Sequence, residues 1–85
     1  MTMMKRESFR IADIYVPVKR RATLKPDLVQ EIAANMLEVG QQTPIMVRQE
    51  DGGRLVLVEG LHRLEAFRAL GETTIVGYLV QARKH

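Results

Sequence analysis

Gly60 stands between an apolar stretch and a helical pattern, and a histidine and an arginine follow it closely. Residues 55–58 predict a strand, and residues 61–70 predict a helix. The first turn of a helix presents unpaired N–H groups at the positive end of the helix dipole, which favours an anion there. His62 and Arg63 lie on that turn, and both side chains can donate to phosphate oxygens. The junction therefore predicts a phosphate or nucleotide site.

The same residues also have a purely structural interpretation. Glycine between a strand and a helix is common as a turn residue, and Arg63 would then lie on a solvated helix face beside Glu59. Electrostatics favours the anion, because the helix dipole opposes a cationic His62 on the first turn unless an anion occupies the site.

Two more groups of residues suit either a binding or a structural role. Gly40 and Pro44 follow a predicted helix, where a helix cap and a rigid turn would be enough to explain them. Pro17 precedes three consecutive cations at residues 19–21. Such a run is common on a solvated surface, whereas a loop stiffened by Pro17 would bring the cations to a phosphate if the fold places it near Gly60.

The remaining elements are predicted from apolar spacing. A first strand is expected around residues 9–14, and residues 15–21 are expected to be extended or looping because Pro17 lacks an N–H donor. A helix is predicted over residues 26–39, strands over 45–49 and 54–58 with a turn between them, and a final strand over 73–80. The 26–39 helix is expected to turn one face to the core: Leu28, Val29, Ile32, Ala33, Met36 and Leu37.

Composition limits the class of protein. Eighty-five residues, 46% hydrophobic and 27% charged, predict one soluble domain, and no apolar run is long enough to span a membrane. The chain has no cysteine and two histidines, which excludes disulfides and a cysteine-ligated zinc site, predicts no metal cluster, and favours the cytoplasm. Net charge is +3, but residues 1–25 hold seven bases against two acids, or +5, which suits a polyanion partner. Residues 1–7 are expected to be flexible, 8–81 to form the domain, and 82–85 to be a polar tail.

Three sequence segments together resemble one known superfamily. They are Val-Pro at 16–17, Gly-Gln-Gln-Thr-Pro-Ile-Met-Val at 40–47, and Val-Glu-Gly-Leu-His-Arg-Leu-Glu-Ala at 58–66. With the surrounding order of elements, this pattern is similar to the ParB N-terminal and sulfiredoxin-like superfamily from about residue 9 to 80. The resemblance implies an α+β fold, a small mixed sheet with two main helices, that binds a nucleotide triphosphate: CTP in partition proteins and ATP in sulfiredoxin.

The resemblance also implies which residues bind the nucleotide. The phosphate box would be Gly60, Leu61, His62 and Arg63. The second loop would be Gly40, Thr43 and Pro44, and Arg20 or Arg21 would supply a cation near the phosphates.

This chain departs from both family patterns in the phosphate box. Partition proteins commonly have Gly-Glu-Arg-Arg there, so the acidic residue of that box is missing and Glu59 is the nearest carboxylate. Sulfiredoxin has Gly-Cys-His-Arg, so Leu61 stands where the nucleophile would be, and sulfinic acid reductase chemistry is not expected. Thr43 replaces a glutamine that often precedes the loop proline.

The sequence therefore predicts a nucleotide triphosphate-binding ParB-like domain that acts in DNA partition, plasmid maintenance or transcription control. The expected ligand is ATP or CTP, with or without Mg²⁺, and the expected partners are DNA, a second copy of the chain or a partition protein. Two alternatives stay open. One is an NTPase or ParB-like nuclease, for which Glu59 is the candidate catalytic carboxylate and Glu65 the other nearby acid. The other is a small non-specific DNA-binding or protein-interaction module.

Overall fold

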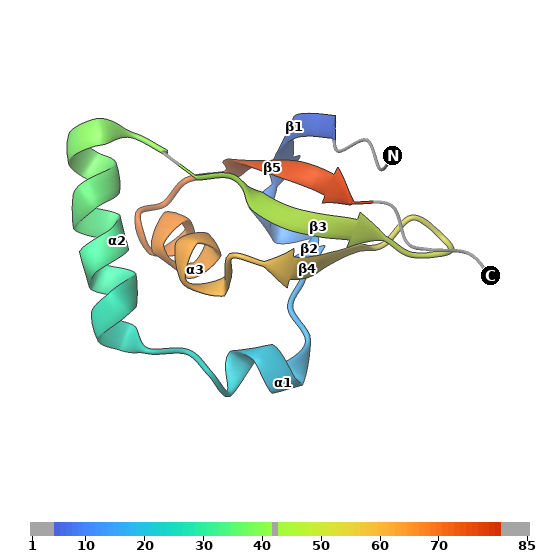
Figure 1. The fold of residues 1–85 in the computed structure, drawn as a ribbon, viewed down its shortest axis with the longest axis horizontal. Coiled ribbons are helices and arrows are strands. Elements are labelled where there is room, and N and C mark those ends of the chain that lie inside the picture. Colours follow the sequence, from blue (N-terminus) through green and yellow to red (C-terminus); the bar gives the residue numbers. More distant parts are fainter. Residues whose placement is uncertain (1–4, 42, 81–85) are drawn as a thin grey trace.

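The computed structural model describes residues 5–41 and 43–80. These residues form a five-stranded sheet, two main helices, a one-turn helix and a short 3-10 turn (Figure 1). The strands are β1 (Lys5–Arg10), β2 (Ile14–Tyr15), β3 (Ile45–Gln49), β4 (Leu55–Glu59) and β5 (Thr74–Val80). The helices are α1 (Val18–Arg21), α2 (Pro26–Val39) and α3 (Leu61–Ala69), and the 3-10 turn is η1 (Ile11–Asp13).

The sheet is mixed, with strand order β1-β5-β3-β4-β2. The β1/β5 and β3/β4 pairs are antiparallel, whereas the β3/β5 and β2/β4 pairs are parallel. Helix α3 lies between the sheet and α2 (Figure 1). The predicted α+β fold with a mixed sheet and two main helices is confirmed.

The core fills the space between the sheet and α3. Helix α3 contributes four buried residues, and the strands supply most of the others. In β4 the consecutive residues Val56 and Leu57 are both buried, although successive strand residues point to opposite faces of a sheet. The largest fully buried side chains are Ile45, Leu57, Leu64, Ile75, Val47 and Val56.

Helix α2 has the predicted bounds, but it is less buried than its pattern suggested. Pro26 occupies its first turn, and the Gly40 N–H caps its end by donating to the Met36 carbonyl at 2.8 Å. No residue of α2 is fully buried, and Leu37, expected in the core, is 72% exposed. The reason is that α2 packs mainly on α3 and not on the sheet, so only a narrow side of α2 is covered.

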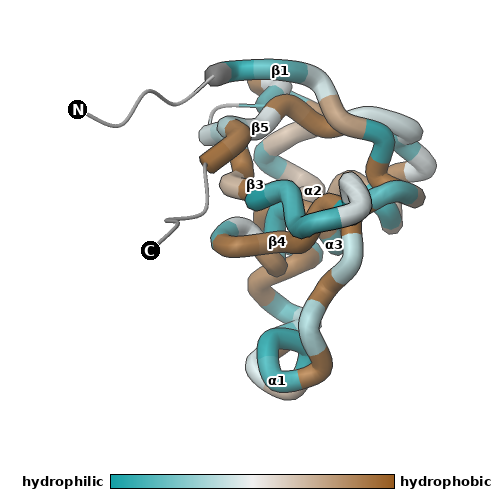
Figure 2. Tube along the Cα trace, turned by 90° about the vertical axis from the view of Figure 1, so that its right-hand side faces the viewer, coloured by the Kyte–Doolittle hydropathy of each residue, from teal (hydrophilic) through white to brown (hydrophobic). Residues whose placement is uncertain are grey.

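The N-terminal prediction needs two corrections. The single strand expected around residues 9–14 is divided into two. Strand β1 pairs with β5 and ends at η1, and the chain then crosses to the other edge of the sheet, where β2 pairs with β4. The expected extended segment 15–21 contains α1, in which the Pro17 carbonyl accepts from the N–H groups of Arg20 and Arg21. Helix α1 is largely hydrophilic and projects from the body of the molecule (Figure 2).

Residues 5–7 of the segment expected to be flexible belong to β1. The first four residues and the expected tail at 82–85 lie outside the described residues. None of the helices in the described part of the chain has the length and hydropathy needed to cross a bilayer.

Candidate functional site

The junction between β4 and α3 depends on glycine at position 60. Gly60 has φ 107° and ψ 29°, a conformation that L side chains rarely adopt. A Cβ at this position would lie 2.6 Å from Ile45 Cγ2 and 3.3 Å from Ile45 Cα. The absence of a side chain therefore lets the start of α3 rest directly on the start of β3.

The first turn of α3 presents backbone donors. The Leu64 N–H donates to the Gly60 carbonyl at 2.8 Å, which starts the helical hydrogen-bond ladder. The three preceding N–H groups, at residues 61–63, have no hydrogen-bond partner within the described residues, and no side chain caps this end of the helix. Three backbone donors at the positive end of a helix dipole can bind an anionic oxygen.

Arg63 is half-buried and forms no ion pair within residues 5–41 and 43–80. An ion pair with Glu59, which one structural interpretation of Arg63 expects, is thus not present in that part of the chain, where Glu59 is exposed at the end of β4. A half-buried guanidinium without a protein counter-charge is suited to a ligand anion.

His62 has a hydrogen bond that the sequence did not reveal. The backbone N–H of Lys25, the N-cap residue of α2, donates to His62 Nε2 at 3.0 Å. Because Nε2 accepts this hydrogen bond, it carries no proton in this arrangement, and the ring N–H donor is Nδ1. His62 therefore fixes the start of α2 to the first turn of α3.

The loop after α2 is held to the sheet by Gln41. Its side chain donates from Nε2 to the Val76 carbonyl at 2.8 Å and accepts the Val76 N–H at Oε1 at 2.9 Å. Nε2 also donates to the Thr43 carbonyl at 3.1 Å. The amide thus pairs with β5 as a strand residue would, just before β3 begins. Gln41 was missed because its partner lies 35 residues away in sequence.

The predicted loops meet at Ile45. Thr43 and Pro44 run directly into Ile45, and Gly60 packs on the same residue from the end of β4. The tertiary structure therefore brings the end of the 40–44 loop next to the Gly60 turn. Gly40 lies at the far end of that loop, where it caps α2.

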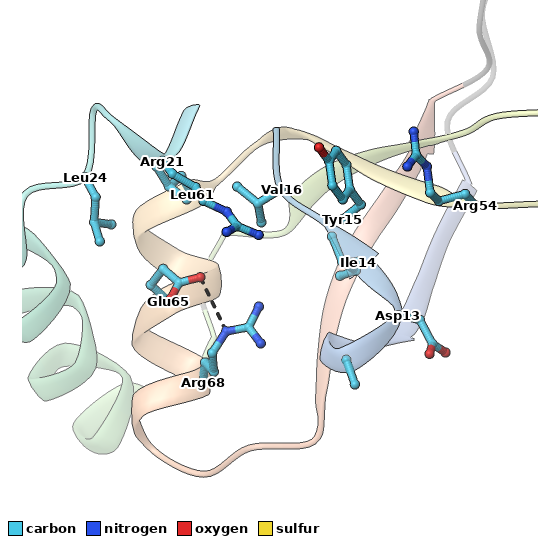
Figure 3. Close-up of a pocket in the computed structure, with 11 residues that line it drawn as sticks. Asp13, Ile14, Tyr15, Val16, Arg21, Leu24, Arg54, Leu61, Glu65 and Arg68 are labelled. Carbon is cyan, nitrogen blue, oxygen red and sulfur yellow. Dashed lines mark hydrogen bonds and ion pairs between the residues drawn. The ribbon is translucent and has the colours of Figure 1, made fainter. Parts of the chain in front are cut away.

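The two candidate arginines of α1 differ in position. Arg21 points towards α3, beside Leu61 and Glu65 (Figure 3). Arg20 is exposed and does not line this space.

Arg21 belongs to a groove of about 620 Å³ that the sequence did not predict. One wall is the segment from η1 to α1, and the other is the face of α3 that carries Leu61, Glu65 and Arg68 (Figure 3). At one end the guanidinium of Arg54 lies 4.4 Å from the centre of the Tyr15 ring. Only the i, i+4, i+7 spacing on α3 was visible in the sequence, because Tyr15 and Arg54 meet through the parallel pairing of β2 with β4.

No group of three acidic, histidine or cysteine side chains within the described residues is placed to hold a metal ion. Glu65 is engaged by Arg68 at 3.4 Å on the groove side of α3.

The sheet order, the two helices and the glycine turn before α3 define a small α+β domain of the ParB/sulfiredoxin-like fold. The sequence matches the family model of the ParB N-terminal domain over residues 4–85. The chain therefore belongs to the ParB N-terminal domain family. Comparison with curated proteins found no match.

Solved structures of two kinds are similar to this fold. Sulfiredoxin from Arabidopsis thaliana has a TM-score of 0.82 and 27% sequence identity, with 92% of this chain and 86% of that chain covered. The chromosome-partitioning protein ParB from Caulobacter crescentus, complexed with CTP-gamma-S, has a TM-score of 0.73 and 20% identity, with 95% and 46% covered. A Pnob8-like ParB-N domain has a TM-score of 0.77 and 15% identity, with 96% and 31% covered. The chain thus spans less than half the length of these two ParB chains.

Proposed function

We propose that this chain is a ParB-like domain that binds a nucleotide triphosphate at the start of α3. The observation that carries the proposal is the pairing of three unengaged backbone N–H groups with the half-buried Arg63, which has no ion pair within the described residues. A triphosphate offers several anionic oxygens to such donors, and the helix dipole adds to the attraction.

The proposed phosphate box is Gly60, Leu61, His62 and Arg63. The N–H groups of Leu61, His62 and Arg63 would bind phosphate oxygens, and Arg63 would add its guanidinium. Gly60 would supply the turn that presents them. His62 also presents Nδ1, since Nε2 is engaged by the Lys25 N–H. The neighbouring loop of Gly40, Thr43 and Pro44 would border the nucleotide, and Arg20 or Arg21 of α1 would add a cation.

The proposed ligand is ATP or CTP, bound with or without Mg²⁺. Belonging to the ParB N-terminal domain family and the likeness to a ParB complexed with CTP-gamma-S support CTP, whereas the likeness to sulfiredoxin leaves ATP open. A role in DNA partition, plasmid maintenance or transcription control fits the same family and the +5 charge of residues 1–25. The catalytic alternative has less support, because Glu65 is paired with Arg68 and Glu59 is an isolated exposed carboxylate.

Thermal melts with and without nucleotide test the assignment of Arg63. Bound ligand at 100 times its dissociation constant stabilises the native state by about 2.7 kcal/mol, which raises the Tm of a domain this size by roughly 10–20 °C. Arg63→Ala should abolish that rise with ATP or CTP and lower the Tm of the unliganded protein only slightly. Arg10→Ala is the matched control, because it removes an exposed arginine from β1.

A structural arginine predicts the opposite result. The unliganded Arg63→Ala protein would then be destabilised, and its response to nucleotide would equal that of the wild type. An unchanged ligand-induced shift in this variant would falsify the phosphate-binding role of Arg63. Release of inorganic phosphate, measured in the same samples with Mg²⁺, separates binding from hydrolysis.

A further inference from the structure

We propose that the groove beside α3 binds a peptide segment of a partner protein in which a bulky apolar side chain lies next to an acidic one. This groove adjoins the proposed nucleotide site and shares Leu61 and Arg21 with it, but Arg63 does not line the groove. Leu61, Glu65 and Arg68 line the groove from one face of α3. Arg63 lies about 200° around the helix from Leu61, since each residue advances by about 100°.

The apolar part of the groove is suited to a side chain and not only to water. Its base is formed by buried residues, including Val16 and Leu61, which are 3% and 6% exposed. Tyr15 and Leu24, at 39% and 37% exposed, border the groove from the other wall. An apolar surface rimmed by polar residues marks a contact site, and tyrosine and arginine are the side chains enriched at the centres of protein interfaces.

Two exposed apolar residues line this groove. Six large hydrophobic residues are exposed in the described part of the chain, and two of them, Tyr15 and Leu24, are among the groove residues. Val18 lies on α1 outside the groove, and the other three belong to α2. Tyr15 and Leu24 therefore offer apolar surface at the groove itself.

The charges in the groove call for one acidic group on the partner. Arg68 is paired with Glu65 at 3.4 Å, and Arg54 is paired at 2.7 Å with Glu50, which lies outside the groove. Arg21 has no ion pair within residues 5–41 and 43–80, and it points towards Leu61 (Figure 3). A single unpaired guanidinium beside an apolar base fits a carboxylate that adjoins a leucine or an aromatic ring.

A nucleic acid fits the groove less well. Affinity for a phosphate backbone comes from several cations that face the same way. Here Glu65 lies between the guanidinium groups of Arg21 and Arg68, and Asp13, whose carboxylate points away from α3 in Figure 3, adds a second negative charge. These acids weaken the attraction for a chain of several phosphates, whereas the guanidinium of Arg21 can still pair with a single carboxylate.

Titration of the whole chain with fluorescent peptides tests the proposal. The probes are short peptides in which one Asp or Glu lies next to one Leu or Phe, with the acid either before or after the apolar residue. Control peptides carry Lys in place of the acid or Ser in place of the apolar residue. Amide signals of Tyr15, Arg21, Leu61 and Glu65 should move in NMR spectra as an acidic apolar peptide binds. Single-stranded DNA is the competing ligand.

Three substitutions separate the groove from general charge attraction. Arg21→Glu should weaken peptide binding by about tenfold to a hundredfold, and Leu24→Ser should weaken it as well. Lys19→Glu makes the same charge change on α1 outside the groove, and it should leave binding nearly unchanged. Arg63→Ala should retain peptide binding, so this proposal and the nucleotide proposal can fail independently.

Several results would overturn the proposal. They are the absence of binding by every acidic apolar peptide, equal binding of the lysine controls, equal losses in Arg21→Glu and Lys19→Glu, or signal changes confined to residues outside the groove. Stronger perturbation of the groove signals by single-stranded DNA than by any peptide would assign the groove to nucleic acid instead.

Discussion

Replacing Gly60 by alanine should lower the free energy of unfolding for two separate reasons, one conformational and one steric. The first part is conformational, since φ at Gly60 is 107° and a side chain in the left-handed region costs about 1–2 kcal/mol. The second part is steric, since the new Cβ would lie 2.6 Å from Ile45 Cγ2, and overpacking of a core site costs about 1–3 kcal/mol. Gly60→Ala should therefore cost about 2–5 kcal/mol.

Two other glycines supply matched controls, one for each part. Gly71 has φ 79°, and no atom lies within 4 Å of the position that a Cβ would take there, so Gly71→Ala should show only the conformational cost. Gly77 lies in β5 with an ordinary negative φ, but its Cβ would lie 2.8 Å from Ile45 Cγ1, so Gly77→Ala should show only the steric cost. The loss for Gly60→Ala should be close to the sum of the two.

Urea unfolding and thermal melts of the three variants measure these costs. A domain of this length has a stability of roughly 4–13 kcal/mol, and a loss of about 3 kcal/mol lowers Tm by roughly 12–24 °C. If Gly60→Ala is no more costly than Gly71→Ala, then β3 moves away from the new methyl group without resistance. In that case the close approach of α3 to Ile45 would not be a determinant of the site.

Three further predictions concern the loop, the hairpin and DNA. Gln41→Ala should cost about 1–3 kcal/mol, because it leaves the N–H and carbonyl of Val76 without these partners; hydrogen exchange at the Val76 amide should accelerate, and unchanged protection would contradict the pairing. Hydrogen bonds from Arg54, and then from Arg48, lower the pKa of Glu50. The stabilisation from Glu50 should thus be complete above the ordinary glutamate pKa and disappear as pH falls through the lowered one, so the stability of Glu50→Gln should converge with that of the wild type in acid; a gap that persists at the lowest pH would contradict this. Any binding to duplex DNA should be independent of sequence and should weaken steeply with salt, because the seven basic side chains of residues 1–25, with a net charge of +5, can contact phosphates. A flat salt response or a strong preference for one sequence in a titration series would refute this prediction.

Elements with strong local signals were predicted well from the sequence. Helix α2 begins at Pro26 and ends before Gly40, as their backbone preferences required. The Gly60 turn and the following helix were likewise recognisable, since a change of apolar period around a glycine is a local property. The resemblance to the ParB and sulfiredoxin-like superfamily rested on these same segments, and the family match confirms it.

Local patterns could not show where the N-terminal segment goes. The break between β1 and β2 follows from pairing with strands far along the chain, β5 for one and β4 for the other. Burial of α2 was overestimated for the same reason: an amphipathic pattern gives the apolar face of a helix but not the element that covers it.

The sequence by itself determined the chemistry of the candidate site, because Gly60, His62 and Arg63 are neighbours in the chain and one helical turn presents them together. The tertiary structure alone decided their partners. It brought the Lys25 N–H to His62, placed Gly60 on Ile45, and made Arg21 and Leu61 line the same groove. The physical reason is that each of these contacts joins residues at least 15 positions apart in the printed sequence, where spacing along a single helix or strand carries no information.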